Sequence, residues 1–164
     1  MELITILFWI SSVCVMPLWL MMILIPNSKI TKTIVGSNYC LFPMLICYSI
    51  AVIPSIPNLL MTLATQMPTP EIVKDLFSDD YTIMLGWLHY LALDTLAGRW
   101  IWTRLISQNK PIYQSAPTLI MCMMVAPLGV IVGIITTLNR NENFLSLIKE
   151  RDNFIISNFD FFLS

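Results

Sequence analysis

The stretch that decides the fold runs from Gly86 to Trp100 and reads GWLHYLALDTLAGRW. It is an apolar run of helical length in which His89, Asp94 and Arg99 are the ionisable side chains. Ionisable residues inside a long apolar segment are rare in membrane helices, where they mark functional sites or buried polar contacts. We therefore expect a membrane helix here, and we expect the rest of the chain to pack around it.

The composition of the whole chain is that of a membrane protein. Of the 164 residues, 57% are hydrophobic and 12% are charged, whereas a soluble domain carries about 25% charged residues. Charged residues are absent from the intervals 3–28, 33–70 and 111–139, and each interval can hold the roughly 20 apolar residues that cross a bilayer. The lipid bilayer is thus the expected partner, and the net charge of −1 gives no reason to expect nucleic-acid binding.

These three intervals and the stretch Gly86–Trp100 predict an all-α protein, an integral membrane bundle of four transmembrane helices with proline kinks. The expected spans cover residues 3–25, 39–53, 81–106 and 116–138. Prolines that would kink or end a span are Pro17, Pro54, Pro57 and Pro127. The four spans form one expected domain, residues 1–138, and a tail follows over residues 139–164.

The segments outside the spans carry their own signals. Residues 71–77 suit a short surface helix, and Asp79 and Asp80 suit the N-terminal cap of the third span. Gly129 and Gly133 are four residues apart, a spacing that lets another helix approach closely. For the tail two alternatives stay open: a frayed terminus, or an amphipathic and aromatic segment that docks on a partner or on the membrane surface.

The cysteine and histidine content argues against a disulfide framework and against a metal site. Cys14, Cys40, Cys47 and Cys122 lie in or beside apolar runs, and His89 is the single histidine. No pair of these residues has the spacing of a structural zinc site. We therefore expect no structural metal.

The helical period divides the polar side chains of the central stretch between two faces. At about 100° per residue, Asp94 shares a face with Trp87 and Tyr90. His89 and Arg99 are each five residues from Asp94, which places them toward the opposite face. On a regular helix Asp94 therefore pairs with neither of them.

A charged aspartate at the middle of a bilayer costs about 2.5 to 3.5 kcal/mol. Asp94 must therefore find a partner, be wetted by a cavity, or be protonated. The side chains that could form a hydrogen bond with it are Ser11, Ser12, Tyr48, Ser49 and Tyr90. Asp94 and His89 then have two interpretations: they line a buried ligand site, or they form a polar network that fixes the packing of the helices.

The end of the central helix is rich in arginine and tryptophan. Arg99 and Arg104 suit anchors that reach the membrane interface along their apolar stems. Trp100 and Trp102 suit the belt of aromatic side chains at that interface. Arg99 and Trp100, like Trp87 and Tyr90, are also expected to contact a ligand if the helix binds one.

The central motif resembles the hallmark of the abscisic-acid-deficiency-four-like family, the neoxanthin synthase family of plants with its algal and cyanobacterial relatives. The resemblance covers about residues 7–138, and Leu93 stands where the family pattern has an aromatic residue. The motifs that carry it are Gly86–Asp94, Gly98-Arg99-Trp100, Pro17-Leu18-Trp19, Pro26, Asn109-Lys110-Pro111, Pro117 and Ala126-Pro127-Leu128-Gly129.

The resemblance implies a protein of photosynthetic membranes, in the thylakoid of a plastid or cyanobacterium or in the plastid envelope, that handles xanthophylls. In the plant branch it implies conversion of the epoxide violaxanthin to the allene neoxanthin. Opening the epoxide needs a proton donor, and forming the allene needs a base. Asp94 and His89 are the expected catalytic pair, which makes a carotenoid-isomerase-like enzyme that requires no redox cofactor.

Two other interpretations stay open. A non-catalytic, pigment-binding or stabilising subunit of a photosystem or antenna complex would stack its aromatic side chains on carotenoid. It would use His89 as a chlorophyll ligand and dock through its tail. A transporter or channel is disfavoured because the chain has four short spans and no internal repeat. Asp94 and His89 facing one enclosed cavity would favour catalysis over the subunit role.

Overall fold

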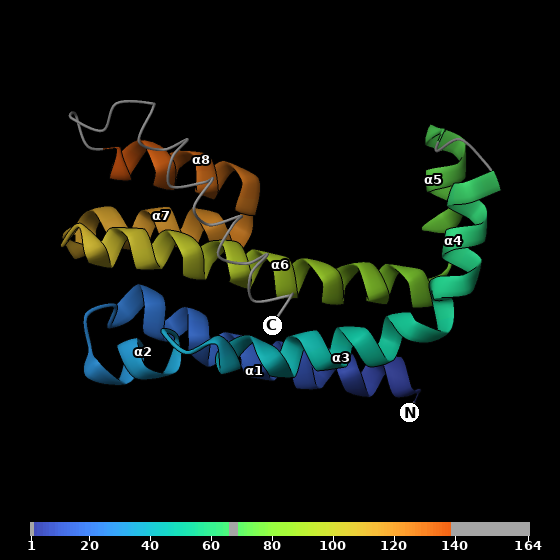
Figure 1. The fold of residues 1–164 in the computed structure, drawn as a ribbon, viewed down its shortest axis with the longest axis horizontal. Coiled ribbons are helices and arrows are strands. Elements are labelled where there is room, and N and C mark those ends of the chain that lie inside the picture. The colour runs from blue at the N-terminus through green and yellow to red at the C-terminus, as the bar shows by residue number, and fades with distance from the viewer. Residues whose placement is uncertain (1, 66–68, 139–164) are drawn as a thin grey trace, which may run out of the picture.

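The computed structural model describes residues 2–65 and 69–138, and every element in those two ranges is helical (Figure 1). The predicted all-α class is therefore confirmed for this part of the chain. The predicted tail, residues 139–164, lies outside the described residues. Its separation from a domain of residues 1–138 stays a prediction.

Three helices form the frame and lie side by side along the long axis of the molecule (Figure 1): α1 (Leu3–Leu24), α3 (Phe42–Val52) and α6 (Asp80–Ser107). α1 agrees with the expected first span, and Pro17 lies inside it without ending it. α6 is one residue longer at each end than the expected third span. The stretch Gly86–Trp100 thus forms the central part of α6.

Shorter helices connect the frame. α5 (Pro70–Leu76) confirms the predicted surface helix, and α2 (Lys29–Ile34) forms in the connection between the first two expected spans. α2 begins there because the Ser28 hydroxyl accepts a hydrogen bond from the backbone N–H of Ile30 at 3.3 Å, a typical N-terminal cap. Asp79 caps α6 as predicted, whereas Asp80 is the first residue of that helix.

Two helical stretches, Leu3–Leu24 and Asn38–Thr62, are long and apolar enough to cross a membrane. α6 has 28 residues, which at about 1.5 Å per residue is also long enough. It is less apolar than the other two stretches because it carries Asp94, Arg99 and Arg104. By length and composition alone, the structure therefore offers two membrane spans rather than the four that were expected.

The chain changes direction at the prolines that follow α3. A 3-10 turn, η2 (Ile53–Ser55), contains Pro54, and α4 (Ile56–Thr65) follows with Pro57 in its first turn. Figure 1 shows α4 leaving the direction of α3 at the end of the molecule where α6 begins. The chain bends at these prolines because proline removes one backbone donor and prevents a straight continuation of the helix.

The prediction that residues 116–138 form a single membrane-spanning helix is wrong. This part of the chain forms a helical hairpin of α7 (Ile112–Met124) and α8 (Ala126–Thr137), in which α8 folds back along α7 (Figure 1). Val125 breaks the helix with φ −146° and ψ 81°, and Pro127 lies in the first turn of α8, where a missing N–H costs nothing. Each arm is about 20 Å long, too short to cross the roughly 30 Å of a bilayer core.

Two glycines allow the hairpin to close and to pack on the frame. Gly129 of α8 lies against the backbone of Cys122 in α7, and Gly133 lies against the side chain of Ile101 in α6. A Cβ atom at either glycine would overlap these neighbours. The predicted close approach is confirmed, and it involves two different helices, one at each glycine.

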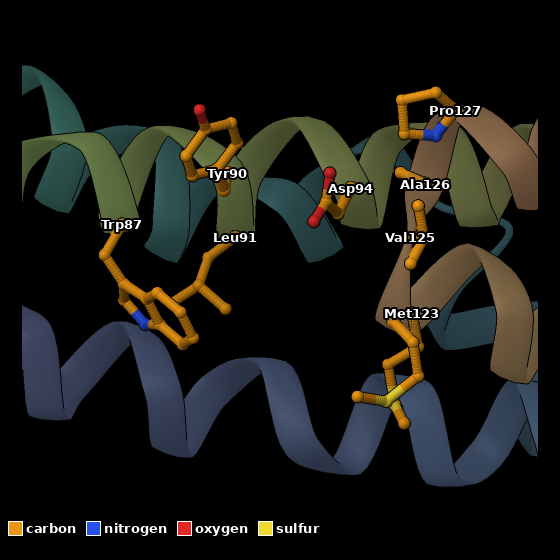
Figure 2. Close-up of a pocket in the computed structure, with 9 residues that line it drawn as sticks. Trp87, Tyr90, Leu91, Asp94, Met123, Val125, Ala126 and Pro127 are labelled. Carbon is orange, nitrogen blue, oxygen red and sulfur yellow. The ribbon is translucent and has the colours of Figure 1, made fainter.

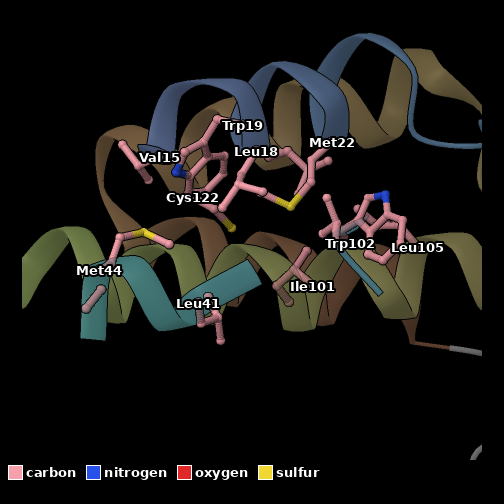
Figure 3. Close-up of a cluster of buried hydrophobic side chains, with 13 residues drawn as sticks. Val15, Leu18, Trp19, Met22, Leu41, Met44, Ile101, Trp102, Leu105 and Cys122 are labelled. Carbon is pink, nitrogen blue, oxygen red and sulfur yellow. The ribbon is translucent and has the colours of Figure 1, made fainter. Parts of the chain in front are cut away.

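The main hydrophobic core lies where the hairpin covers the frame (Figure 3). It contains Trp102, which is only 4% exposed. The expectation that Trp102 belongs to an interfacial aromatic belt is therefore wrong, whereas Trp100 is exposed. A smaller cluster lies at the other end of the frame, between α1, α3 and α6, and consists of Ile4, Leu7, Cys47, Ala51 and Leu88.

Candidate functional site

Asp94 lines a pocket of about 370 Å³ between α6 and the turn of the α7–α8 hairpin (Figure 2). Besides Asp94, every lining residue is apolar or aromatic. α6 supplies Trp87, Tyr90 and Leu91 as well as Asp94, and the hairpin supplies Met123, Met124, Val125, Ala126 and Pro127.

The pocket forms because one face of α6 meets the break in the hairpin. Trp87, Tyr90, Leu91 and Asp94 follow each other at helical spacing, which confirms the prediction that Asp94 shares a face with Trp87 and Tyr90. The hairpin reaches along α6 only as far as this face, because α7 ends at Met124 and the chain then turns back. Asp94 therefore lies at the border between the covered and uncovered parts of α6.

Among the described residues, Asp94 supplies the only carboxylate that lines this pocket, beside the phenol of Tyr90. Its side chain is half-buried, and Trp87 and Tyr90 beside it are 51% and 59% exposed. Figure 2 shows the carboxylate beside the hairpin turn, with the indole of Trp87 pointing toward α1. Such a pocket can hold an apolar molecule by its walls and one polar group by hydrogen bonding to a single carboxyl group.

His89 lies elsewhere. Its ring is 5.2 Å, centroid to centroid, from the ring of Tyr48 in α3 and 6.3 Å from the ring of Tyr90. It is exposed and does not line the Asp94 pocket. The structure therefore does not bring the two expected catalytic residues into one cavity. Tyr48, one of the five candidate hydrogen-bond partners of Asp94, packs beside His89.

Arg99 reaches across to the segment between α2 and η1 (Asn38–Leu41). Its Nε donates to the carbonyl of Val35 at 2.6 Å, and its Nη2 donates to the carbonyl of Gly36 at 2.9 Å and to Oδ1 of Asn38 at 2.8 Å. Arg99 does not line the Asp94 pocket. Its three hydrogen bonds attach the segment that connects α2 with α3 to the side of α6.

Trp100 is also outside the pocket. The guanidinium carbon of Arg104 lies 5.3 Å from the centre of its ring, which is a cation–π contact. The Nε of Arg104 also donates to the hydroxyl of Thr137 at 3.2 Å, and Nε2 of Gln108 donates to the carbonyl of Thr137 at 2.6 Å. These contacts hold the end of α8 on the end of α6 and so position the hairpin.

The hairpin residues of the pocket were not expected from the sequence. Residues 116–138 form a nearly unbroken apolar run, which is typical of a membrane span. The signal that could have located the turn is Pro127, because proline lacks the backbone N–H that a helix interior needs and is favoured in the first turn of a new helix. Among the described residues no group of three or more histidine, cysteine or acidic side chains could hold a metal ion.

Comparisons with known proteins place the pocket within a shared region. The model of a protein family described as ABA DEFICIENT 4-like matches residues 6–132, which include every residue that lines the pocket. The chain is 21% identical over 141 residues to Protein ABA DEFICIENT 4, chloroplastic, of Arabidopsis thaliana. That alignment covers 84% of this chain and 63% of the relative, so the chain spans less than two thirds of the relative's length. No solved structure matches the chain.

Proposed function

The chain belongs to the ABA DEFICIENT 4-like family, and on that premise we propose that it is a membrane protein of the thylakoid that binds and isomerises a xanthophyll. The observation that carries the proposal is the Asp94 pocket, in which one carboxyl group lies among apolar and aromatic side chains. A xanthophyll has the matching chemistry, because its end rings carry oxygen and its chain is an apolar polyene.

The arrangement in the membrane follows from the helix lengths. By number of residues α1, the stretch Asn38–Thr62, which bends at Pro54, and α6 are each long enough to span the bilayer, and we propose that the α7–α8 hairpin enters it and returns on the same side. Irregular backbone at membrane depth is tolerated where it lines a cavity, as Val125 does in the Asp94 pocket. We thus propose three spans and a re-entrant hairpin in place of four spans.

The proposed reaction needs one acid that becomes one base. Protonated Asp94 donates its proton to the epoxide oxygen, the carbon–oxygen bond opens, and positive charge develops on the polyene. The carboxylate that remains then takes a proton from the polyene, which leaves a hydroxyl and an allene. The reaction is an isomerisation, so that it consumes no oxidant and no reductant, and His89 outside the pocket is not required.

The test is turnover of violaxanthin by the purified protein in lipid vesicles, with products separated by chromatography. We expect Asp94→Asn to lower turnover by a factor of about 100 or more, the usual contribution of a general acid–base group. Asp75→Asn, at an exposed carboxylate on α5, is the matched control and should turn over normally. Turnover that survives in Asp94→Asn would refute the acid–base role.

His89→Gln addresses the catalytic pair that the sequence suggested. The position of His89 beside Tyr48 predicts turnover within about threefold of the unsubstituted protein, since a residue that touches no reacting atom removes little of the roughly 100-fold acid–base effect. A loss as large as that of Asp94→Asn would restore His89 to the reaction.

A second candidate function is a pigment-binding subunit of a photosystem or antenna complex. The observation that favours it is the exposed imidazole of His89 on the outside of the frame, where it could ligate a chlorophyll. Gentle purification from the native membrane distinguishes the two functions. Chlorophyll and photosystem proteins in a fixed ratio would support the subunit, whereas xanthophyll alone on an isolated protein would support the enzyme.

A further inference from the structure

Beyond the hairpin turn, one face of the frame is aromatic and uncovered. Figure 1 shows α1 and α6 continuing well past the turn of the α7–α8 hairpin. Phe8 and Trp9 of α1 and Trp87 of α6 meet on this part of the frame, and we call these three residues the aromatic face. The ring centroids of Phe8 and Trp87 are 6.3 Å apart, and those of Phe8 and Trp9 are 5.6 Å apart.

The two tryptophans of the aromatic face are accessible rather than part of the core, and Phe8 beside them is half-buried. Trp9 is 59% exposed and Trp87 is 51% exposed, and neither belongs to the two hydrophobic clusters of the described residues. Exposed tryptophan away from the ends of a membrane helix presents a flat apolar surface to whatever lies beside it. In the proposed arrangement the surroundings are lipid or a molecule dissolved in lipid.

The aromatic face is continuous with the Asp94 pocket. Trp87 belongs to both, since it also lines the pocket. From Asp94 to Asp80, where α6 begins, the helix rises about 20 Å. A rod that starts at Asp94 can therefore run along the aromatic face toward the other side of the membrane.

A rod-shaped ligand is too large for the pocket, so that part of it must lie outside. A volume of about 370 Å³ is at the lower end for ligand pockets and suits one substituted ring. The rest of an extended polyene must lie outside the pocket. The hairpin blocks one direction along α6, so that the open direction leads along the aromatic face.

We propose that the aromatic face is a second subsite that holds the polyene chain of the ligand whose oxygenated end ring occupies the Asp94 pocket. This inference rests on the proposed function and deepens it. In this subsite the flat conjugated chain of the ligand packs against indole and phenyl rings. Such contacts are favourable without any charged group. α1 contains no charged residue, and the first ones after it are Lys29 and Lys32. The aromatic face therefore has no charged side chain on the α1 side.

The experiment measures the binding of two probes by the protein in lipid nanodiscs, followed by the shift in probe absorption. One probe is violaxanthin. The other carries the same epoxide-bearing ring on a side chain of only a few carbons, so that it fills the pocket but cannot reach Phe8 and Trp9. The double variant Phe8→Ala/Trp9→Ala leaves the pocket lining intact.

We expect the double variant to bind violaxanthin about tenfold more weakly, the size of effect for losing two aromatic contacts, and to bind the short probe as before. Equal affinity for the short probe also shows that the variant is folded. Tyr39→Ala/Phe42→Ala is the matched control, because that exposed pair has nearly the same ring geometry, with centroids 5.3 Å apart at 84° against 5.6 Å at 86°. It should leave both affinities unchanged.

Each other outcome has a definite meaning. If the double variant binds violaxanthin as well as the unsubstituted protein does, the aromatic face is not a subsite, while the Asp94 pocket stands. Equal weakening of both probes would likewise overturn the subsite. If the unsubstituted protein binds neither probe, the proposed function fails and the subsite fails with it.

Discussion

The two halves of α6 have opposite environments although one continuous helix contains both. In residues 80–90 the single buried side chain is Leu88. In residues 91–107 buried positions recur at helical spacing, at Ala92, Thr95, Gly98, Ile101, Trp102 and Leu105. The difference arises because the α7–α8 hairpin packs on the second half and ends beside Asp94.

This contrast explains how one acidic side chain can be both held by the fold and open to a ligand. A full-length fourth span would have covered α6 along its whole length and buried Asp94 among helices. A hairpin with two arms of about 20 Å stops part of the way along α6. Asp94 therefore lies at the edge of the cover, next to an exposed surface that begins at Tyr90 and Trp87.

The largest expected effect contrasts two tryptophans that are two residues apart in the covered half. Trp102 is 4% exposed and Trp100 is 46% exposed. Trp102→Ala should lower the free energy of unfolding by about 3 to 5 kcal/mol, because it leaves a large cavity in the core. Trp100→Ala should lower it by about 1 kcal/mol or less, through the lost contact with Arg104. Denaturant unfolding in detergent micelles measures both, and equal losses would contradict the structure.

A smaller effect contrasts two glycines. Gly129→Ala should lower the free energy of unfolding by about 1 to 3 kcal/mol, the usual cost of overpacking, because the new methyl group meets the backbone of Cys122. Gly86→Ala, in the uncovered half, should be neutral or stabilising by up to about 1 kcal/mol. Its methyl group meets only the side chain of Phe77, whose nearest ring atom is 3.1 Å away, and that side chain is 43% exposed. Thermal unfolding of the two variants decides the matter, and a destabilised Gly86→Ala would show that the first half is covered after all.

The smallest expected effect is a pH dependence at the start of the uncovered half. The hydroxyl of Thr82 and the backbone N–H groups of Tyr81 and Thr82 donate to the Asp79 carboxylate and lower its pKa. A lowered pKa stabilises the fold fully above the ordinary pKa of aspartate, about 4, and that stabilisation is lost as the pH falls through the lowered value. The melting temperature of Asp79→Asn should therefore fall less steeply between about pH 4 and pH 2 than that of the unsubstituted protein. The same pH dependence in both proteins would refute the cap.

Much of the frame could be predicted from local pattern. The uncharged runs located α1 and α3, and the prolines at 54 and 57 located the bend that follows. The helical period placed Asp94 on the face of Trp87 and Tyr90 and separated it from His89. These features depend on residues near one another in the chain, so that the order of the residues is enough to infer them.

The sequence by itself determined that the described chain is helical, where α1, α3, α5 and α6 lie, and which face of α6 carries Asp94. Only the tertiary structure decided that the last apolar run folds into a hairpin, that Trp102 enters the core while Trp100 does not, and that Arg99 binds backbone carbonyls. Each of these depends on which distant surface fills the space beside a helix. Apolar side chains suit a lipid-facing surface and a protein core equally well, and backbone carbonyls leave no mark in the order of the side chains.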